Sequence, residues 1–349
     1  MTMSTIHRRT FLSGVAAAAS ALAAPHVANA QAATLKITTW GGKWGEIMKA
    51  DLLPAFEREF KCTVSADQAF PFLPKLQASP KNNPIYDVLH ANSNEQWKAF
   101  DEGIVGAKLD VKDVPNLKDV YPYAISDKIV GVSIFTSAIG LGYRTDKGLT
   151  PPTSWKDLAD PKLAGARGGY IIPVNSLGQA HLMLLGKIYG RGYNDLDAAY
   201  KALEALKPIK LFDFTGQMER AMLSGEVNMG VIHDSGVLRY EGTNQPVEFA
   251  TPSEGVLALE QVLNPTPGSK VKELAHAYID YMLREDVQKK LAEAVWYSPS
   301  NTKVKLDAKY DARLFNTPEK VAKLVQMDWK WYNDRKDDID ARVARILRG

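Results

Sequence analysis

The chain has 349 residues, a nearly balanced charge of 43 lysines and arginines against 40 aspartates and glutamates, and one cysteine, Cys62. This balance provides no basic surface for nucleic acid, and a single thiol cannot form a disulfide within the chain. The length is comfortable for two lobes, each with its own apolar core.

The first thirty residues have the pattern of a bacterial export signal. Arg8 and Arg9 precede an alanine-rich apolar run, and Ala28-Asn-Ala30 provides a small-x-small cleavage site. This order is typical of secretory signal peptides, and the paired arginines favour the twin-arginine type. The apolar run is too short to span a bilayer. We predict cleavage near Ala30 and a mature protein that works in the periplasm.

The next hundred residues alternate between strand and helix patterns. Strands are predicted at residues 35–40, 62–65 and 86–91, and helices at residues 43–60 and 72–78 and around Trp97 and Phe100. This alternation is typical of a parallel, doubly wound sheet.

A second α/β series follows. Strands are predicted at residues 130–136, 138–143, 169–172, 209–212, 227–232, 247–250 and 256–262. Helices are predicted at residues 176–189, 195–206, 217–224, 274–283 and 285–295, and a helical tail at residues 318–347. Two such series in one exported chain indicate two lobes with a cleft. Ligands of open α/β sheets collect at the carboxyl ends of the strands.

Several segments resemble one known family. They are Thr39-Trp40 and residues 85–91, 137–143, 153–158, 223–232, 277–286 and 296–301. Together they resemble the extracellular solute-binding proteins of ABC importers, in the cluster that includes the spermidine/putrescine-binding proteins. The resemblance implies an α/β periplasmic-binding-protein fold, with two lobes built on doubly wound sheets, several hinge crossovers and a ligand cleft between the lobes.

The resemblance also implies how the chain is divided and what it works with. Lobe 1 would comprise residues 31–137 and 257–301, and lobe 2 residues 138–256 and 302–349. The expected partners are a small-molecule solute and an inner-membrane ABC permease. A monomer without a cofactor or a catalytic role is implied.

Charged and aromatic residues at strand ends are the first candidate ligand contacts. Trp40 ends the first strand, where its ring could stack on an amine or simply pack. Lys43 lies in the next helical turn, where it could meet a ligand carboxylate or remain solvated. His233 and Asp234 follow an apolar strand. Asp234 could balance a ligand ammonium or cap a helix, and His233 could donate or stack.

Polar residues at helix starts form a second group of candidates. Asn92, Ser93 and Asn94 could cap a helix, and by the resemblance the same loop supplies hydrogen bonds to a ligand. Asn175 and Ser176 allow the same two interpretations. Thr215 begins a helix whose N–H groups could hold an anion.

Two further candidates lie near the predicted crossovers. Glu260 is an acid in an otherwise apolar strand, where it requires a partner, either a ligand amine or an internal Arg or Lys. Tyr297 lies near the third crossover implied by the resemblance.

These residues favour a small amine or a zwitterionic amino compound, captured by hinge closure. The polyamine binders place acids and tryptophans where this chain has residues 173–176, His233 and Ala258, which disfavours a long polyamine. A ferric ion, another metal or an oxyanion is the alternative, with His233, Asp234 and Glu260 as possible metal ligands. An exported hydrolase is less favoured, because the chain has no nucleophile-elbow or zinc-protease motif.

Overall fold

The N-terminal strand–helix series forms as the sequence predicts. The computed structural model describes residues 32–106 and 108–348, so the predicted signal segment lies outside the described residues. The elements are β1 (Thr34–Thr38), α1 (Gly42–Ile47), the π-helical turn η1 (Met48–Leu52), α2 (Leu53–Phe60), β2 (Thr63–Asp67), α3 (Leu73–Gln77), β3 (Val88–Asn92) and α4 (Ser93–Asp101). The predicted helix 43–60 is therefore continuous, with one widened turn.

The second series is also present. Its strands are β5 (Arg167–Tyr170), β6 (Lys210–Phe212), β7 (Met229–His233) and β8 (Val247–Ala250). Its helices are α5 (Ser176–Tyr189), α6 (Leu196–Ala205), α7 (Thr215–Ser224) and α8 (Ser235–Leu238), and α9 (Lys272–Met282) and α10 (Glu285–Val295) follow later. Short elements complete the described chain: η2 (Pro115–Asp119), η3 (Pro122–Ile125), η4 (Thr145–Lys147), η5 (Trp155–Ala159), η6 (Pro161–Leu163), η7 (Ile172–Val174), β10 (Ser298–Pro299) and α11 (Ala308–Asp311).

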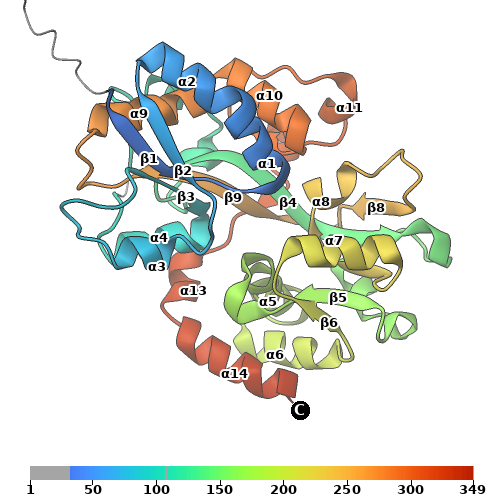
Figure 1. Cartoon of the computed structure of the whole chain (residues 1–349). Coiled ribbons are helices and arrows are strands. Elements are labelled where there is room, and N and C mark those ends of the chain that lie inside the picture. Colours follow the sequence, from blue (N-terminus) through green and yellow to red (C-terminus); the bar gives the residue numbers. More distant parts are fainter. Residues whose placement is uncertain (1–31, 107, 349) are drawn as a thin grey trace, which may run out of the picture. The chain divides into compact units, whose positions relative to one another are not determined.

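One mixed sheet runs through the described residues and includes the long strands β4 (Val132–Arg144) and β9 (Val256–Pro265). Its main strands lie in the order β2-β1-β3-β9-β4-β7-β5-β6. β1 pairs in parallel with β2 and β3, and β5 pairs in parallel with β6 and β7. The middle pairs, β3–β9, β9–β4 and β4–β7, are antiparallel. Two parallel halves are thus joined by an antiparallel centre, and helices cover both halves (Figure 1).

Two long strands connect the halves. β9 (Val256–Pro265) pairs with the first part of β4 (Val132–Arg144), and the second part of β4 pairs with β7 and β8. The prediction of two separate strands in this region is wrong, because β4 continues through Ser137. A register shift between Ser133 and Phe135 is the irregularity along its pairing with β9.

The C-terminal tail differs from the predicted helix. It consists of α12 (Pro318–Val321), β11 (Leu324–Val325), α13 (Trp329–Asn333) and α14 (Lys336–Arg348). The helix is interrupted because β11 pairs in parallel with the start of β9, and Asp328 then caps α13 by accepting from the Trp331 N–H. α13 packs against α4 and α14 against α6, so the tail runs along both halves (Figure 1).

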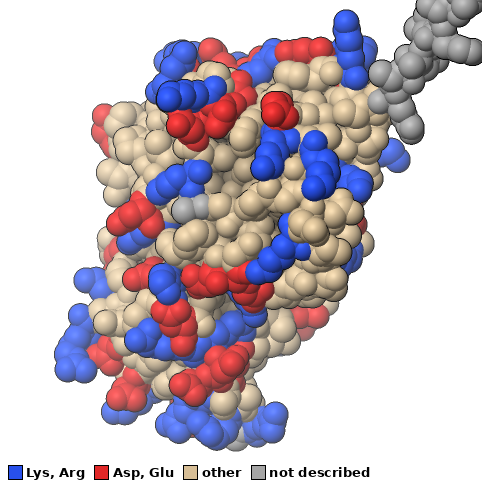
Figure 2. Space-filling view, turned by 90° about the vertical axis from the view of Figure 1, so that its left-hand side faces the viewer, with Lys and Arg blue, Asp and Glu red and all other residues tan. Residues whose placement is uncertain are grey.

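The exterior and the core follow from the composition. Lys and Arg alternate with Asp and Glu over the face shown in Figure 2, as a nearly balanced charge predicts. Cys62 is a buried free thiol, and Trp44 packs in the main apolar core. Among the described residues, the structure has no helix that is both long and apolar enough to cross a membrane.

Candidate functional site

Asp234 is the most unusual of the predicted site residues. It follows β7, caps α8 by accepting from the Ser235 N–H at 2.7 Å, and is fully buried. Its second oxygen, Oδ2, has no hydrogen-bond partner among the described residues. Burial raises the pKa of Asp234 to about 7, although backbone hydrogen bonds and the more distant Arg313 oppose this rise. A buried carboxylate of this kind needs a further donor or cation.

Aromatic and hydroxyl groups surround this carboxylate. The Nδ1 atom of His233 lies 2.8 Å from the Ser235 hydroxyl. The rings of His233 and Tyr297 are 6.5 Å apart and nearly perpendicular. Burial lowers the pKa of His233 to about 3, so the ring is neutral, and burial together with the Asp234 charge raises the pKa of Tyr297 to about 12.

Four other predicted residues join one series of side-chain hydrogen bonds, which we term the amide relay. Its members are Trp40, Gln261, Asn92, Ser176, Asn94 and Gln179. The donor–acceptor distances along it are 2.5, 3.1, 3.3, 3.1 and 3.0 Å. The relay begins at the end of β1, crosses β9 and the end of β3, and reaches the first turn of α5.

An aromatic cluster encloses the Trp40 end of the relay. Trp40 contacts Phe70 and Phe72, at centroid distances of 6.1 and 5.5 Å. His90 is buried between Trp40 and Trp44, and neither of its ring nitrogens has a partner among the described residues. Burial lowers the pKa of His90 to about 3. Trp40 therefore packs among these rings, and its role as a wall of the ligand site stays a prediction.

Glu260 lies apart from Asp234. Gln326 Nε2 donates to Glu260 Oε1 at 3.2 Å, and burial raises the pKa of Glu260. Glu260 pairs with Thr136 in the β4–β9 ladder, whereas Ser137, beside Asp234, is the next residue of β4. Since consecutive side chains point to opposite faces of a strand, the two acids lie on opposite faces of the β4–β9 pair. The role of Glu260 in binding stays a prediction.

The remaining candidates have individual surroundings. Asn175 caps α5 by accepting from the Leu177 N–H, and its amide donates to the Asp213 carbonyl. Ser93 is buried in the first turn of α4, and Thr215 is half-buried at the start of α7. Lys43 is exposed and lies 3.4 Å from Glu46 on its own helix. The structure thus brings Trp40, Asn92, Asn94 and Ser176 together but not Lys43.

Sequence reasoning missed Gln261, Gln179 and His90. Gln261 is buried, and it lies directly opposite Asn92 in the β3–β9 ladder. A polar residue directly after the predicted Glu260 was the available signal, but the partner of Gln261 depends on strand register. Gln179 was hidden inside a predicted helix, and His90 inside a predicted strand.

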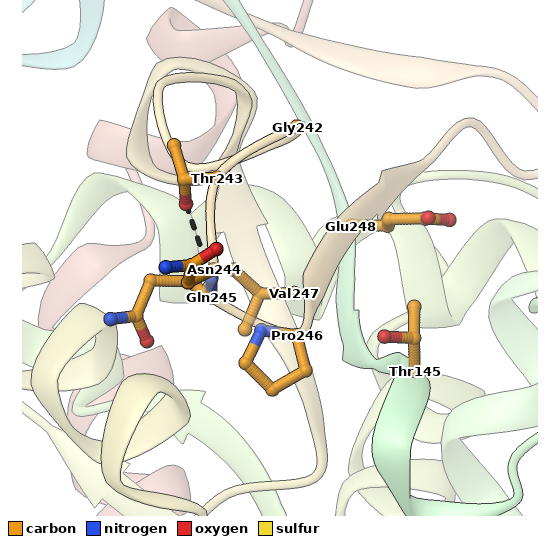
Figure 3. A pocket seen from close by; sticks show the side chains of 8 residues that line it. All are labelled: Thr145, Gly242, Thr243, Asn244, Gln245, Pro246, Val247 and Glu248. Carbon is orange, nitrogen blue, oxygen red and sulfur yellow. Dashed lines mark hydrogen bonds between the residues drawn. The ribbon is translucent and has the colours of Figure 1, made fainter.

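The structure also has a surface depression away from these residues. Its volume is about 300 Å³, and it is lined by Thr145 and residues 242–248, as Figure 3 shows. The turn is held by the Gln245 N–H, which donates to Thr243 Oγ1 at 3.2 Å. None of the predicted ligand residues lines it. Across residues 32–106 and 108–348, no group of three or more His, Cys, Asp or Glu side chains is arranged to hold a metal ion.

The sequence and the fold define a class of protein. The profile of the bacterial extracellular solute-binding proteins matches residues 51–317, and the chain belongs to this family. A crystal structure of an ABC transporter protein from Clostridium perfringens is 25% identical, with a TM-score of 0.76, and the match covers 89% of this chain and 99% of that one. The predicted two-lobe binding-protein fold and the predicted family are confirmed.

Two curated relatives are spermidine/putrescine-binding periplasmic proteins. The protein of Escherichia coli K12 is 24% identical over 227 residues, which cover 62% of this chain and 64% of the relative. Protein 1 of Haemophilus influenzae is 27% identical over 276 residues, 75% of each chain. The chain thus spans somewhat less than two thirds of the first relatives that it matches.

Proposed function

We propose that this protein is the periplasmic solute-binding component of an ABC importer and captures a small amine or a zwitterionic amino compound. The two halves would close on the solute by bending at β4 and β9 and would present the closed form to a membrane permease. The family, and the polyamine-binding function in the names of its relatives, support this reading.

The observation that carries the proposed ligand class is the state of Asp234. Its carboxylate is fully buried, one oxygen is unpartnered among the described residues, and no ion pair is formed there. A ligand ammonium would supply the missing donor and the missing charge together. The neighbours Tyr297 and Ser137 are neutral, so neither supplies a charge that would balance the Asp234 carboxylate.

A long polyamine is less favoured than a compact amine. An extended cation requires acids at both ends, and the second predicted acid, Glu260, lies on the opposite face of the strand pair. A metal ion is not favoured either, because the predicted ligands His233, Asp234 and Glu260 are not gathered around one point.

The proposal is tested by calorimetric titration of the purified protein with putrescine, spermidine and 4-aminobutyrate. Asp234→Asn keeps the shape and the Ser235 acceptor but removes the charge. Breaking a buried ion pair costs about 3–5 kcal/mol, so the dissociation constant of a bound amine should rise more than a hundredfold, in line with about 1.4 kcal/mol per tenfold change.

Asp286→Asn is the matched control, because Asp286 is exposed on α10 and pairs with Arg284. This variant should bind like the unmodified protein. Equal affinity of Asp234→Asn and the unmodified protein for every amine would refute the proposed ligand class. Binding of ferric ion or an oxyanion alone would replace the amine with the alternative cargo.

A further inference from the structure

The amide relay has a single direction, and an indole sets it. An indole N–H can only donate, so Gln261 must present its oxygen to Trp40 and its NH2 group to Asn92. Asn92 must then present its oxygen to Gln261 and its NH2 group to Ser176. The Ser176 hydroxyl accepts that bond and donates its own proton to Asn94, whose NH2 group donates to Gln179. Each amide is oriented by the one before it.

The relay also connects two parts of the chain whose strands are not neighbours in the sheet. In the sheet, β3 and β5 are separated by β9, β4 and β7. The relay passes from the end of β3 directly to α5, the helix that follows β5 after the short turn η7. It joins the two parallel halves of the sheet at side-chain level, and Ser176 is the link between Asn92 and Asn94.

We propose that Gln261 is a positioning residue for the solute site: it fixes the Trp40 ring and the Asn92 amide and couples both, through the relay, to α5. This inference rests on the proposed function, in which Trp40 and Asn92 contact the solute. Gln261 is 3% exposed, and both ends of its amide are engaged by these two residues.

A consequence is that the relay acts as one unit. Hydrogen bonds in series polarise one another, so the loss of one member weakens the bonds on both sides of it. A change at Ser176 should therefore be felt at the Trp40 indole, although three hydrogen bonds separate them. Solute that displaces a member of the relay would likewise alter the attachment of α5.

The first test follows the indole resonances in ¹⁵N–¹H spectra of the whole protein. The Trp40 signal is identified as the one missing in Trp40→Phe, among the seven tryptophans of the chain. We expect Gln261→Met and Ser176→Ala each to shift the Trp40 indole signal more than any other indole signal. Ser224→Ala is the control, since its hydroxyl donates to the Ala221 carbonyl within α7, and it should leave the Trp40 signal unchanged.

The second test is a double-mutant cycle with putrescine as the probe. Gln261→Met and Ser176→Ala should each raise the dissociation constant about tenfold, and the double variant should again show about tenfold, because either change already breaks the relay. Independent contacts would instead multiply to about a hundredfold. Multiplying effects, or a Trp40 signal that ignores Ser176→Ala, would overturn the inference.

The two proposals can fail separately. If none of putrescine, spermidine and 4-aminobutyrate binds the unmodified protein, the proposed ligand class fails, while the indole spectra still test the relay. If Gln261→Met does not fold, Gln179→Met removes the far end of the relay and takes its place in both tests.

Discussion

At the scale of single residues, the buried carboxylate of Asp234 should make stability depend on pH. Burial raises its pKa from 3.8 to about 7. Between these values the folded chain keeps a proton that the unfolded chain releases, so the free energy of unfolding falls as pH rises. The destabilisation that comes from burying the ionised carboxylate is fully present above about pH 7 and is absent below about pH 4. One such group contributes a slope of up to about 1.4 kcal/mol per pH unit.

We therefore expect Asp234→Asn to flatten this slope and to be more stable than the unmodified protein at pH 7.5. Urea unfolding between pH 4.5 and 7.5 measures the difference between the two proteins. Glu95, whose pKa burial also raises to about 7, contributes with the same sign in both and cancels in the comparison. Identical slopes would show that Asp234 is ionised throughout this range.

At the scale of elements, one glutamine ties α10 to the centre of the sheet. Gln288 is fully buried. Its amide donates to the carbonyls of Ile134 in β4 (2.6 Å) and Met282 in α9 (3.1 Å), and its oxygen accepts from the Asn301 N–H (2.9 Å). An apolar replacement would leave the Met282 carbonyl and the Asn301 N–H without this partner, whereas the Ile134 carbonyl also accepts from the Ser300 N–H. Each buried group without a partner costs about 1–3 kcal/mol.

Gln288→Leu should therefore lower the free energy of unfolding by about 2 kcal/mol or more, measured by urea unfolding. Gln77→Leu is the matched control, because Gln77 is exposed and bonds to Glu102, and surface changes of this kind stay within about 0.5 kcal/mol. Equal stability of the two variants would contradict this prediction and would mean that the Met282 carbonyl and the Asn301 N–H find other partners.

Element prediction succeeded where local chemistry decides the boundary. α5 begins after the capping Asn175 and spans the predicted residues 176–189. It failed where pairing between distant segments decides the boundary. β4 continues through Ser137 because its first part pairs with β9 and its second part with β7. The tail helix is interrupted because β11 pairs with β9. The candidate site shows the same division. Trp40 and Asn92 could be predicted because they lie at strand ends, whereas the contacts of Gln261 depend on the β3–β9 register.

At the scale of the whole molecule, the tail is a second connection between the halves. Asn333 donates to the Asn94 carbonyl at the start of α4, and Lys336 donates to the Pro173 carbonyl before α5. α14 then buries Ile339, Val343 and Ile346, and Lys207 donates to the Ile346 carbonyl. Together with β4 and β9, the tail should make the two halves unfold together.

We expect the full chain to show one calorimetric transition, with equal calorimetric and van't Hoff enthalpies. A chain that ends at Arg335 loses the burial of three apolar side chains, each worth about 1.5–3 kcal/mol. The half built on β5, β6 and β7, which α14 covers through α6, should then melt about 10 °C or more earlier, as a separate transition. Arg345→Ala, on the exposed side of α14, should retain the single transition. Two transitions in the full chain, or an unchanged melt after truncation, would show that β4 and β9 alone set the coupling of the halves.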